Sequence, residues 1–325
     1  MSSRERVAEK IVKDCAIIQI MTNQKLKNKI VVIGAGAVGS TIAYSLMIKN
    51  LTSDITLVDV NKEREQGEVM DISDALSFSE TSTINAGDYD SVKDADIIIL
   101  TAGAAQKDGE SRLDLITKNK NIINSIFKEI KEIKKSAIIL VVSNPVDILT
   151  YLVQEIVDLP KSQVFGTGTA LDSARLRSNL SKRFNIDSHQ IEGFVLGEHG
   201  DSEFIAWSTV SVGGKPITEM LNTEEMTKIC DEVKNEVYEI IKEKGATYYG
   251  IGMTVVDIVE ALMLDQNKIL PVTYRLNDYN GVSDICLGST AVVGSSGIIR
   301  PWLIELNQEE KEKFQESAKK IKEYL

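Results

Sequence analysis

Short apolar runs alternate with amphipathic stretches over the first half of the chain. The runs are rich in isoleucine, leucine and valine, which is typical of buried β-strands, and the stretches between them repeat apolar residues at helical spacing. Strands that alternate with helices in this way predict parallel βαβ units. The predicted strands span residues 30–33, 55–58, 96–100, 137–142 and 164–165.

A long helix is predicted before Asn144-Pro145, and the pattern then changes. Residues 113–134 keep isoleucine and leucine on one face. Beyond Thr167 helices and strands no longer alternate regularly, which favours an α+β organisation. There we predict, in chain order, a helix, β-rich segments at 191–196 and 205–212, helices at 223–244 and 251–264, strands at 268–275 and 284–293, and a charged helix from Gln308.

Two domains and a leading segment follow from the length and from this change of pattern. A chain of 325 residues exceeds the size at which one hydrophobic core usually stops growing. We assign residues 29–166 to a first domain and 167–325 to a second, with the helix near 251–264 packing back on the first. Residues 1–28 are either an amphipathic arm that packs on a neighbouring subunit or a leader, with Met21 as an alternative start.

The composition excludes several classes of partner. The formal net charge is -11 and the sequence shows no clustered lysine or arginine face, so we expect no binding to nucleic acid. No segment reaches the roughly 18 consecutive apolar residues of a membrane span. Cys15, Cys230 and Cys286 are widely spaced and form no CxxC pair, which favours neither a disulfide framework nor a thiolate metal site. We therefore expect a cytoplasmic protein with no bound metal.

A glycine-rich turn follows the predicted strand at 30–33. Gly34, Gly36 and Gly39 permit a tight turn, let the backbone approach a pyrophosphate and allow close packing of the next helix. Asp59 lies twenty positions after Gly39, where its carboxylate can accept hydrogen bonds from a ribose diol. That carboxylate repels a ribose phosphate, so NAD is favoured over NADP. The alternative is a glycine turn that binds no ligand.

Three residues suggest proton transfer and carboxylate binding. His199 lies between glycines and acids that suit an exposed imidazole, which is the side chain most easily set to exchange a proton near neutral pH. A lone histidine is nevertheless more often structural, and His189 is predicted to be a turn residue. Asp172 and Arg175 project from one helical face. Either they form a surface ion pair, or Asp172 orients His199 while Arg175 grips a substrate carboxylate.

A polar segment from Gly103 to Arg112 follows the predicted strand at 96–100. Ligands of open α/β sheets bind at the carboxyl ends of the strands, and a loop of this kind closes over a ligand. Arg112 would then reach the reacting oxygen and stabilise the charge that develops there. The alternative is an ordinary surface loop.

Seven motifs, in order and at suitable spacing, resemble the lactate/malate dehydrogenase family over nearly all of the chain from Lys29. The resemblance implies an α/β fold, with a Rossmann-type parallel-sheet dinucleotide domain followed by an α+β substrate domain. It also implies reversible hydride transfer between NAD and a small 2-oxo or 2-hydroxy acid, in a cytoplasmic homotetramer of glycolysis or fermentation. The motifs are Gly34-Ala-Gly-Ala-Val-Gly39, Thr101-Ala-Gly103, Gly109-Glu-Ser-Arg-Leu113, Ser143-Asn-Pro-Val-Asp147, Gly168-Thr-Ala-Leu-Asp-Ser-Ala-Arg175, Gly197-Glu-His-Gly-Asp201 and Gly245-Ala-Thr-Tyr-Tyr-Gly250.

The resemblance implies a role for each matched residue. His199 is the proton donor and acceptor, Asp172 orients it, and Arg112 polarises the substrate carbonyl. Arg175 holds the substrate carboxylate. The other substrate positions are Gln106, Asn144 and Thr247, and the cofactor positions are Gly34, Gly36, Val38, Gly39, Asp59, Asn144, Thr167 and Ile251.

Gln106 carries the prediction of substrate. Malate enzymes that resemble this chain have arginine at that position, because the second carboxylate of oxaloacetate needs a cation in a closed pocket. A neutral glutamine accommodates the methyl group of pyruvate, so lactate is favoured. The alternatives are a malate dehydrogenase, a branched-chain 2-hydroxy acid dehydrogenase and a non-catalytic NAD-binding protein on the same fold. Residues 204–209 somewhat resemble the branched-chain enzymes.

Three features depart from the family pattern. Ala105 and Asp108 stand where relatives commonly have asparagine and proline, and Lys107 adds a charge to the loop. Arg177, which its place on the helix predicts to be a surface charge, matches an arginine through which many bacterial relatives bind fructose bisphosphate. Glu192 stands in place of the matching histidine. Because an acid repels phosphate, weak or absent activation is expected.

Overall fold

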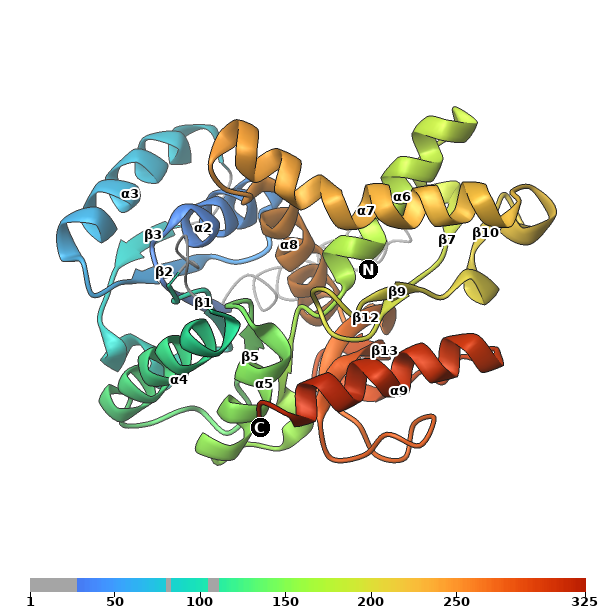
Figure 1. Cartoon of the computed structure of the whole chain (residues 1–325). Helices are drawn as coiled ribbons and strands as arrows, with labels where there is room; N and C mark the ends of the chain where they lie inside the picture. Colours follow the sequence, from blue (N-terminus) through green and yellow to red (C-terminus); the bar gives the residue numbers. More distant parts are fainter. Residues whose placement is uncertain (1–27, 80–82, 105–110) are drawn as a thin grey trace, which may run out of the picture.

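The apolar runs of the first half become parallel strands of one large sheet (Figure 1). The computed structural model describes residues 28–79, 83–104 and 111–325. The leading segment discussed above therefore lies almost wholly outside the described residues. Within them, nine strands pair in the order β14 (Gly297–Pro301), β13 (Cys286–Gly294), β12 (Lys268–Arg275), β6 (Val164–Gly166), β5 (Ile138–Val141), β4 (Ile97–Leu100), β1 (Lys29–Ile33), β2 (Asp54–Val58) and β3 (Thr83–Ala86).

Both faces of the parallel strands are covered, which explains why their apolar runs are unbroken. Ile30 and Val32 of β1 point into one hydrophobic core, and Val31 and Ile33 point into the other. Helices bury their apolar faces against both sides. The first core includes residues of α2 (Ala37–Lys49), α3 (Lys62–Ala75) and α8 (Tyr249–Met263), and the second includes residues of α4 (Arg112–Glu129) and α5 (Val146–Ile156).

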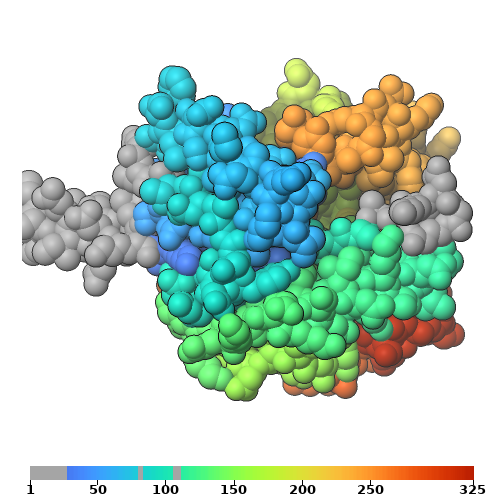
Figure 2. All heavy atoms as spheres, turned by 90° about the vertical axis from the view of Figure 1, so that its left-hand side faces the viewer, coloured from blue at the N-terminus to red at the C-terminus, as the bar shows by residue number. Residues whose placement is uncertain are grey.

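The second half adds a third core and two small sheets. Besides α8, β12, β13 and β14, its helices and strands are α6 (Ala170–Phe184), β7 (Ile191–Glu192), β8 (Val195–Leu196), β9 (Phe204–Ile205), β10 (Ser211–Val212), β11 (Lys215–Pro216), α7 (Thr223–Lys244) and α9 (Gln308–Lys322). Seen from the side of α3 and α4, the C-terminal end of α7, in orange, lies at the same surface as α3, in light blue (Figure 2). No helix of the described ranges is both long enough and apolar enough to cross a membrane.

The predicted α/β class is confirmed, and α7 and β12 have the predicted bounds. One helix is shorter than predicted: α4 ends at Glu129, because Ile130 has an extended backbone and is buried in the second core. The apolar spacing continues past this point only because Ile130 and Ile133 pack from a non-helical segment. Periodicity alone could not distinguish the two conformations.

Two edge strands were not predicted. In β3 only Ile84 is buried, and in β14 the last three residues are exposed, so neither strand has an apolar run. The β-rich segments at 191–196 and 205–212 form short paired pieces rather than continuous strands.

The sheet continues through both halves of the chain. Thr273 of β12 pairs antiparallel with Gly166 of β6, and β13 and β14 extend the sheet beyond it. In addition, α8 packs on α2, where Gly252 lies so close that a Cβ there would be 2.6 Å from the Thr41 side chain. The helix thus brings a segment from the middle of the second half against the first helix of the first half.

Candidate active site

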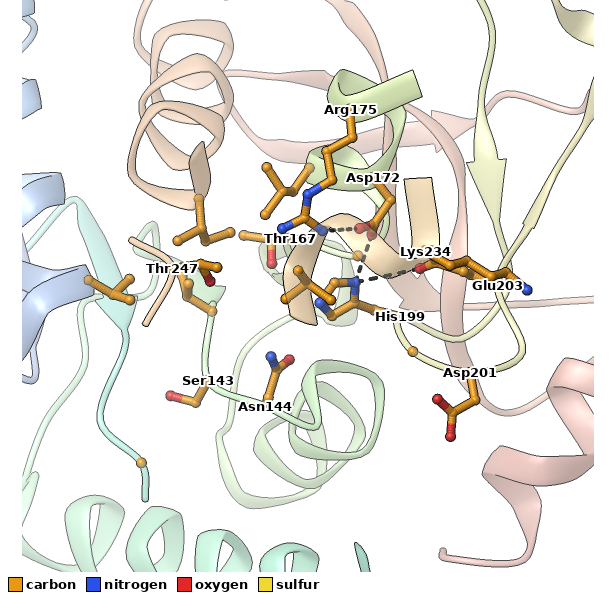
Figure 3. Close-up of a pocket in the computed structure, with 18 of the residues that line it drawn as sticks. Ser143, Asn144, Thr167, Asp172, Arg175, His199, Asp201, Glu203, Lys234 and Thr247 are labelled. Carbon is orange, nitrogen blue, oxygen red and sulfur yellow. Dashed lines mark hydrogen bonds and ion pairs between the residues drawn. The ribbon is translucent and has the colours of Figure 1, made fainter. Parts of the chain in front are cut away.

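A cavity of about 440 Å³ opens at the carboxyl ends of β4, β5 and β6 (Figure 3). The first half contributes Val38 of α2 and the segments after β4 and β5. The second half contributes the segments after β6 and β8, helices α6 and α7, and Thr247 and Ile251 near the start of α8. This is the edge at which ligands of parallel sheets bind. The predicted site residues that line the cavity are Val38, Asn144, Thr167, Asp172, Arg175, His199, Thr247 and Ile251.

Close backbone contacts shape the glycine turn between β1 and α2. Gly34 has a φ of 110°, and a Cβ there would lie 2.6 Å from Thr101 Oγ1. A Cβ on Gly39 would lie 1.8 Å from the Gly34 carbonyl oxygen, so a side chain cannot be accommodated. Gly36 is different, because a Cβ there would meet no atom within 4 Å. The N-terminus of α2 therefore faces open space at Gly36, which suits an anion.

Asp59 follows β2 and lies against this turn. Its Oδ2 accepts a hydrogen bond from the Ala35 N–H at 2.7 Å, and its Oδ1 accepts one from the Asn61 N–H at 2.8 Å. These bonds hold the carboxylate in place and leave lone pairs for further donors. Arg64, the nearest arginine in sequence, lies 4.0 Å from Glu68 and is thus directed to another acid.

A buried aspartate joins the histidine to an arginine. Asp172 is 1% exposed; its Oδ2 lies 2.7 Å from His199 Nδ1, and its Oδ1 accepts from Arg175 Nη1 at 2.8 Å (Figure 3). Asp172 thus makes both contacts that the sequence left as alternatives. The bond at Nδ1 leaves Nε2 free of Asp172 for proton exchange. The His199 side chain is 23% exposed, less than its flanking residues suggested.

The charges around His199 favour its protonated form. Burial lowers the pKa of the imidazole, but the charge and hydrogen bond of Asp172, assisted by Glu203 and Asp147, outweigh burial and raise the pKa to about 9. Burial raises the pKa of Asp172, and the stronger effects of His199 and Arg175 lower it overall. At neutral pH the site therefore holds an imidazolium beside a carboxylate.

Asp147 fixes the backbone of the segment that carries the histidine. Asp147 is 1% exposed, its Oδ2 accepts from the His199 backbone N–H at 2.9 Å, and its Oδ1 accepts from the Thr273 hydroxyl of β12. Gly197 exchanges backbone hydrogen bonds with Gly288 of β13. The sequence motif after β5 contained Asp147, but no role was predicted for it because both partners come from distant segments.

Arg112 lies beside the cavity without lining it. Its guanidinium pairs with buried Glu198 and lies 3.6 Å from Asp201. Its terminal nitrogens are 3.5 Å from where a Cβ on Gly200 would lie, so it is adjacent to the residue after His199. Its contact with a substrate carbonyl stays a prediction.

Three charged residues that line the cavity had no predicted role: Asp201, Glu203 and Lys234. Glu203 and Lys234 come from the segment before β9 and from α7. Glu203 is 6% exposed, and its Oε2 lies 4.0 Å from His199 Nδ1. The one signal in the sequence was the spacing of four residues between His199 and Glu203.

The predictions for Gln106 and Arg177 remain. Gln106, with Ala105, Lys107 and Asp108, lies outside the described residues. Arg177 was predicted to be a surface charge, and its side chain is only partly exposed. The residue lies on α6, which α8 partly covers; burial lowers its pKa, and the charge of Asp257 opposes this effect.

Family models match nearly the whole chain. Residues 28–166 match "lactate/malate dehydrogenase, NAD binding domain", and residues 169–325 match "lactate/malate dehydrogenase, alpha/beta C-terminal domain". The L-lactate dehydrogenase of Clostridium botulinum (strain Loch Maree / Type A3) is 43% identical over 312 residues, which cover 94% of this chain and 98% of that protein. L-lactate dehydrogenase 1 of Clostridium acetobutylicum is 44% identical over 308 residues, with coverage of 93% and 98%.

Solved structures are similar over the same extent. The minor L-lactate dehydrogenase of Enterococcus mundtii, in a ligand-bound form, has a TM-score of 0.89 and 40% identity, and covers 92% of this chain and 97% of its own. A lactate dehydrogenase from a Medee basin deep-sea metagenome library has a TM-score of 0.88 and 38% identity, with coverage of 92% and 98%. The similarity thus includes both halves of the chain.

We expect Gly36→Ala and Gly39→Ala to separate cofactor binding from folding. The methyl group of Gly36→Ala meets open space, so Tm should change little, but it occupies the approach of a pyrophosphate, so NADH affinity should fall at least about tenfold. Gly39→Ala clashes with the Gly34 carbonyl and should reduce stability by roughly 1–3 kcal/mol.

Thermal unfolding and NADH fluorescence titration measure these two effects. Gly67→Ala is the matched control, because a Cβ at Gly67 of α3 also meets no atom within 4 Å, and it should leave NADH affinity unchanged. Unchanged NADH affinity in Gly36→Ala would refute the placement of the pyrophosphate.

Proposed function

This chain belongs to the lactate/malate dehydrogenase family, and we propose that it is an NAD-dependent L-lactate dehydrogenase. The observation that carries the proposal is the cavity in which His199, Asp172 and Arg175 meet beside the NAD-binding domain. Reduction of a 2-oxo acid needs a group that donates a proton and a cation that binds a carboxylate. A non-catalytic NAD-binding protein would need neither.

The residues of the first half fit the cofactor. NAD, when bound, accepts or supplies the hydride. The open space at Gly36 and the N-terminus of α2 suit its pyrophosphate, and the Asp59 carboxylate suits a ribose diol without a phosphate. To the nicotinamide side we assign Val38, Asn144, Thr167 and Ile251, which line the cavity.

Arg175 and His199 perform the remaining chemistry. Asp172 occupies part of the donor fork of Arg175, and the other N–H groups bind the pyruvate carboxylate. As the 2-oxo carbon gains the hydride, its oxygen takes the proton from His199 Nε2, which yields a hydroxyl and a neutral imidazole. Oxidation of lactate reverses both transfers. Asp172 holds the tautomer and stabilises the imidazolium.

Arg112 and Thr247 complete the substrate site. We assign polarisation of the carbonyl to Arg112, whose guanidinium would exchange its contacts with Glu198 and Asp201 for the substrate oxygen. Thr247 borders the cavity between α7 and α8 and contacts the rest of the substrate. Gln106 supports pyruvate over oxaloacetate, in agreement with the curated relatives, which are L-lactate dehydrogenases.

We further propose that the enzyme is a cytoplasmic homotetramer. Helices α2 and α8 pack on each other and leave Tyr44, Ile48 and Met253 exposed by 45%, 61% and 47%. Apolar side chains exposed on neighbouring helices suit an interface between copies of the chain. Free thiols at Cys230 and Cys286 agree with a reducing compartment.

Steady-state kinetics with NADH and three 2-oxo acids test the function. The kcat/KM for pyruvate should exceed those for oxaloacetate and 2-oxoisocaproate by at least about tenfold, which corresponds to about 1.4 kcal/mol of transition-state binding. NADPH should serve less well than NADH, because Asp59 repels its ribose phosphate. A higher kcat/KM with oxaloacetate would refute the lactate assignment.

Gln106→Arg is expected to move the preference toward oxaloacetate, because a guanidinium supplies the cation that the second carboxylate needs. The ratio of kcat/KM for oxaloacetate to that for pyruvate should rise at least about tenfold. Lys107→Arg, which conserves charge at the neighbouring position, is the control. An unchanged ratio in Gln106→Arg would place the choice of substrate elsewhere in the loop or at Thr247.

The pKa of about 9 at His199 predicts opposite pH dependences in the two directions. Pyruvate reduction needs the protonated imidazole, so its kcat/KM should be level below this pH and fall about tenfold per pH unit above it. Lactate oxidation needs the neutral imidazole, so its kcat/KM should rise up to this pH and then level off.

Asp172→Asn should move both breaks to lower pH by about one unit or more, because burial is then opposed only by the weaker effects of Glu203 and Asp147. Asp187→Asn removes the carboxylate beside exposed His189 and is the control, with both breaks expected to stay in place. Breaks that stay in place in Asp172→Asn would exclude His199 as the titrating group.

A further inference from the structure

A second carboxyl group faces His199 from the side of β9. Glu203 Oε2 lies 4.0 Å from His199 Nδ1, and one ligand-type atom from each of Asp172, His199 and Glu203 lies within 4.8 Å of the others. Both carboxyl groups are buried. Two buried acids therefore lie near the same imidazole nitrogen, Nδ1: Asp172 at 2.7 Å and Glu203 at 4.0 Å.

The short β8–β9 hairpin fixes this arrangement. Leu196 pairs with Phe204, so the intervening segment carries both His199 and Glu203. The Glu203 N–H donates to the Gly200 carbonyl at 3.2 Å, and Phe204 packs edge-on against Phe314 of α9. The backbone of Glu203 is thus fixed near the imidazole by strand pairing and by packing of the neighbouring Phe204.

The charges at the site leave Glu203 a distinct role. Asp172 is hydrogen-bonded to the Arg175 guanidinium, so these two opposite charges largely offset one another. A proton on His199 then adds a positive charge, and after Asp172 the carboxyl groups that act on it are Glu203, 4.0 Å from Nδ1, and Asp147, which binds the His199 backbone N–H. In a buried site an imidazolium with a second counter-charge holds its proton more tightly.

The charged groups that act on Glu203 lie on α6, on α7 and on the segment between β8 and β9. Burial and the charge of Asp172 raise the pKa of Glu203 to about 8, and the charges of His199, Lys234 and Arg175 oppose this rise. The charge of Asp147 of α5 also raises the pKa of His199. Burial raises the pKa of the Cys230 thiol of α7, and the charge of Glu203 adds to that rise. Figure 3 shows Lys234 of α7 alongside Glu203, and both residues line the cavity.

We propose that Glu203 is a positioning residue for the proton, the second counter-charge of the His199 imidazolium, and that the Lys234 ammonium stabilises Glu203 in its ionised form. This inference rests on the proposed function only in that it assigns the proton of His199 to catalysis. As Glu203 ionises in the alkaline range, it retains the proton on His199 and so extends pyruvate reduction to higher pH. A neutral Glu203 has the opposite effect and favours oxidation of lactate.

A proton titration of the histidine rings tests the inference in the whole protein. His189 and His199 are the only two histidines in the sequence, so labelling of ring Cε1 gives two NMR signals, and exposed His189 is an internal reference. Glu203→Gln should lower the titration midpoint of His199 by about one pH unit or more. Glu239→Gln, at an exposed position of α7, is the matched control and should leave it in place.

Lys234→Gln tests the second half of the proposal. It should lower the His199 midpoint by less than Glu203→Gln does, because it weakens only the ionisation of Glu203. Combined with Glu203→Gln it should cause no further fall, since its target is gone. Lys228→Gln, which removes an exposed charge of the same helix, is the control. If Glu203→Gln does not fold, the Lys234→Gln titration decides the proposal alone.

An unmoved midpoint in folded Glu203→Gln, or an unmoved or raised one in Lys234→Gln, would overturn the inference. The alkaline break in kcat/KM for pyruvate should move with the midpoint in each variant. The NMR titration needs no catalytic activity. A lowered midpoint in a protein that does not reduce pyruvate would therefore support the role of Glu203 and refute the proposed function, whereas an active enzyme with an unmoved midpoint would do the reverse.

Discussion

The buried negative charge of Asp172 is the constraint on which the rest of the site depends. A carboxylate that is 1% exposed is strongly destabilising unless donors surround it, and here Arg175 and His199 supply them. Both donors are oriented by these bonds: Arg175 binds Asp172 through Nη1, and His199 binds it through Nδ1 rather than Nε2. The electrostatic requirement of one buried group thus orients the two groups that meet a substrate.

Much of the fold could be predicted because its central strands are buried on both faces. Residues 30–33 form an unbroken apolar run for that reason, whereas β3, with Ile84 as its one buried residue, leaves no such signal. The end of α4 was missed because Ile130 is buried without being helical. The pairing of β12 with β6 could not be predicted at all, since it is set by tertiary packing and not by local spacing.

In the candidate site, too, residues that belong to a motif were predicted, and residues that only the tertiary structure brings together were not. His199 and Asp172 were identified by residue type, motif and family resemblance, and the structure places them 2.7 Å apart. Glu203 and Lys234 carry no motif of their own, and they meet the site only because the β8–β9 hairpin and α7 converge on one cavity. Charge clusters assembled from separate segments are therefore the part of a site that a single sequence conceals.

The continuous sheet also has a mechanical consequence. Because β6 pairs with β12, α5 packs on β12 and β13, and α8 packs on α2, each half is built partly on elements of the other. A hinge between the halves would have to break strand pairing and separate buried helices at once. The molecule should therefore respond to force as one rigid block, and ligands must enter and leave through rearrangements smaller than a domain.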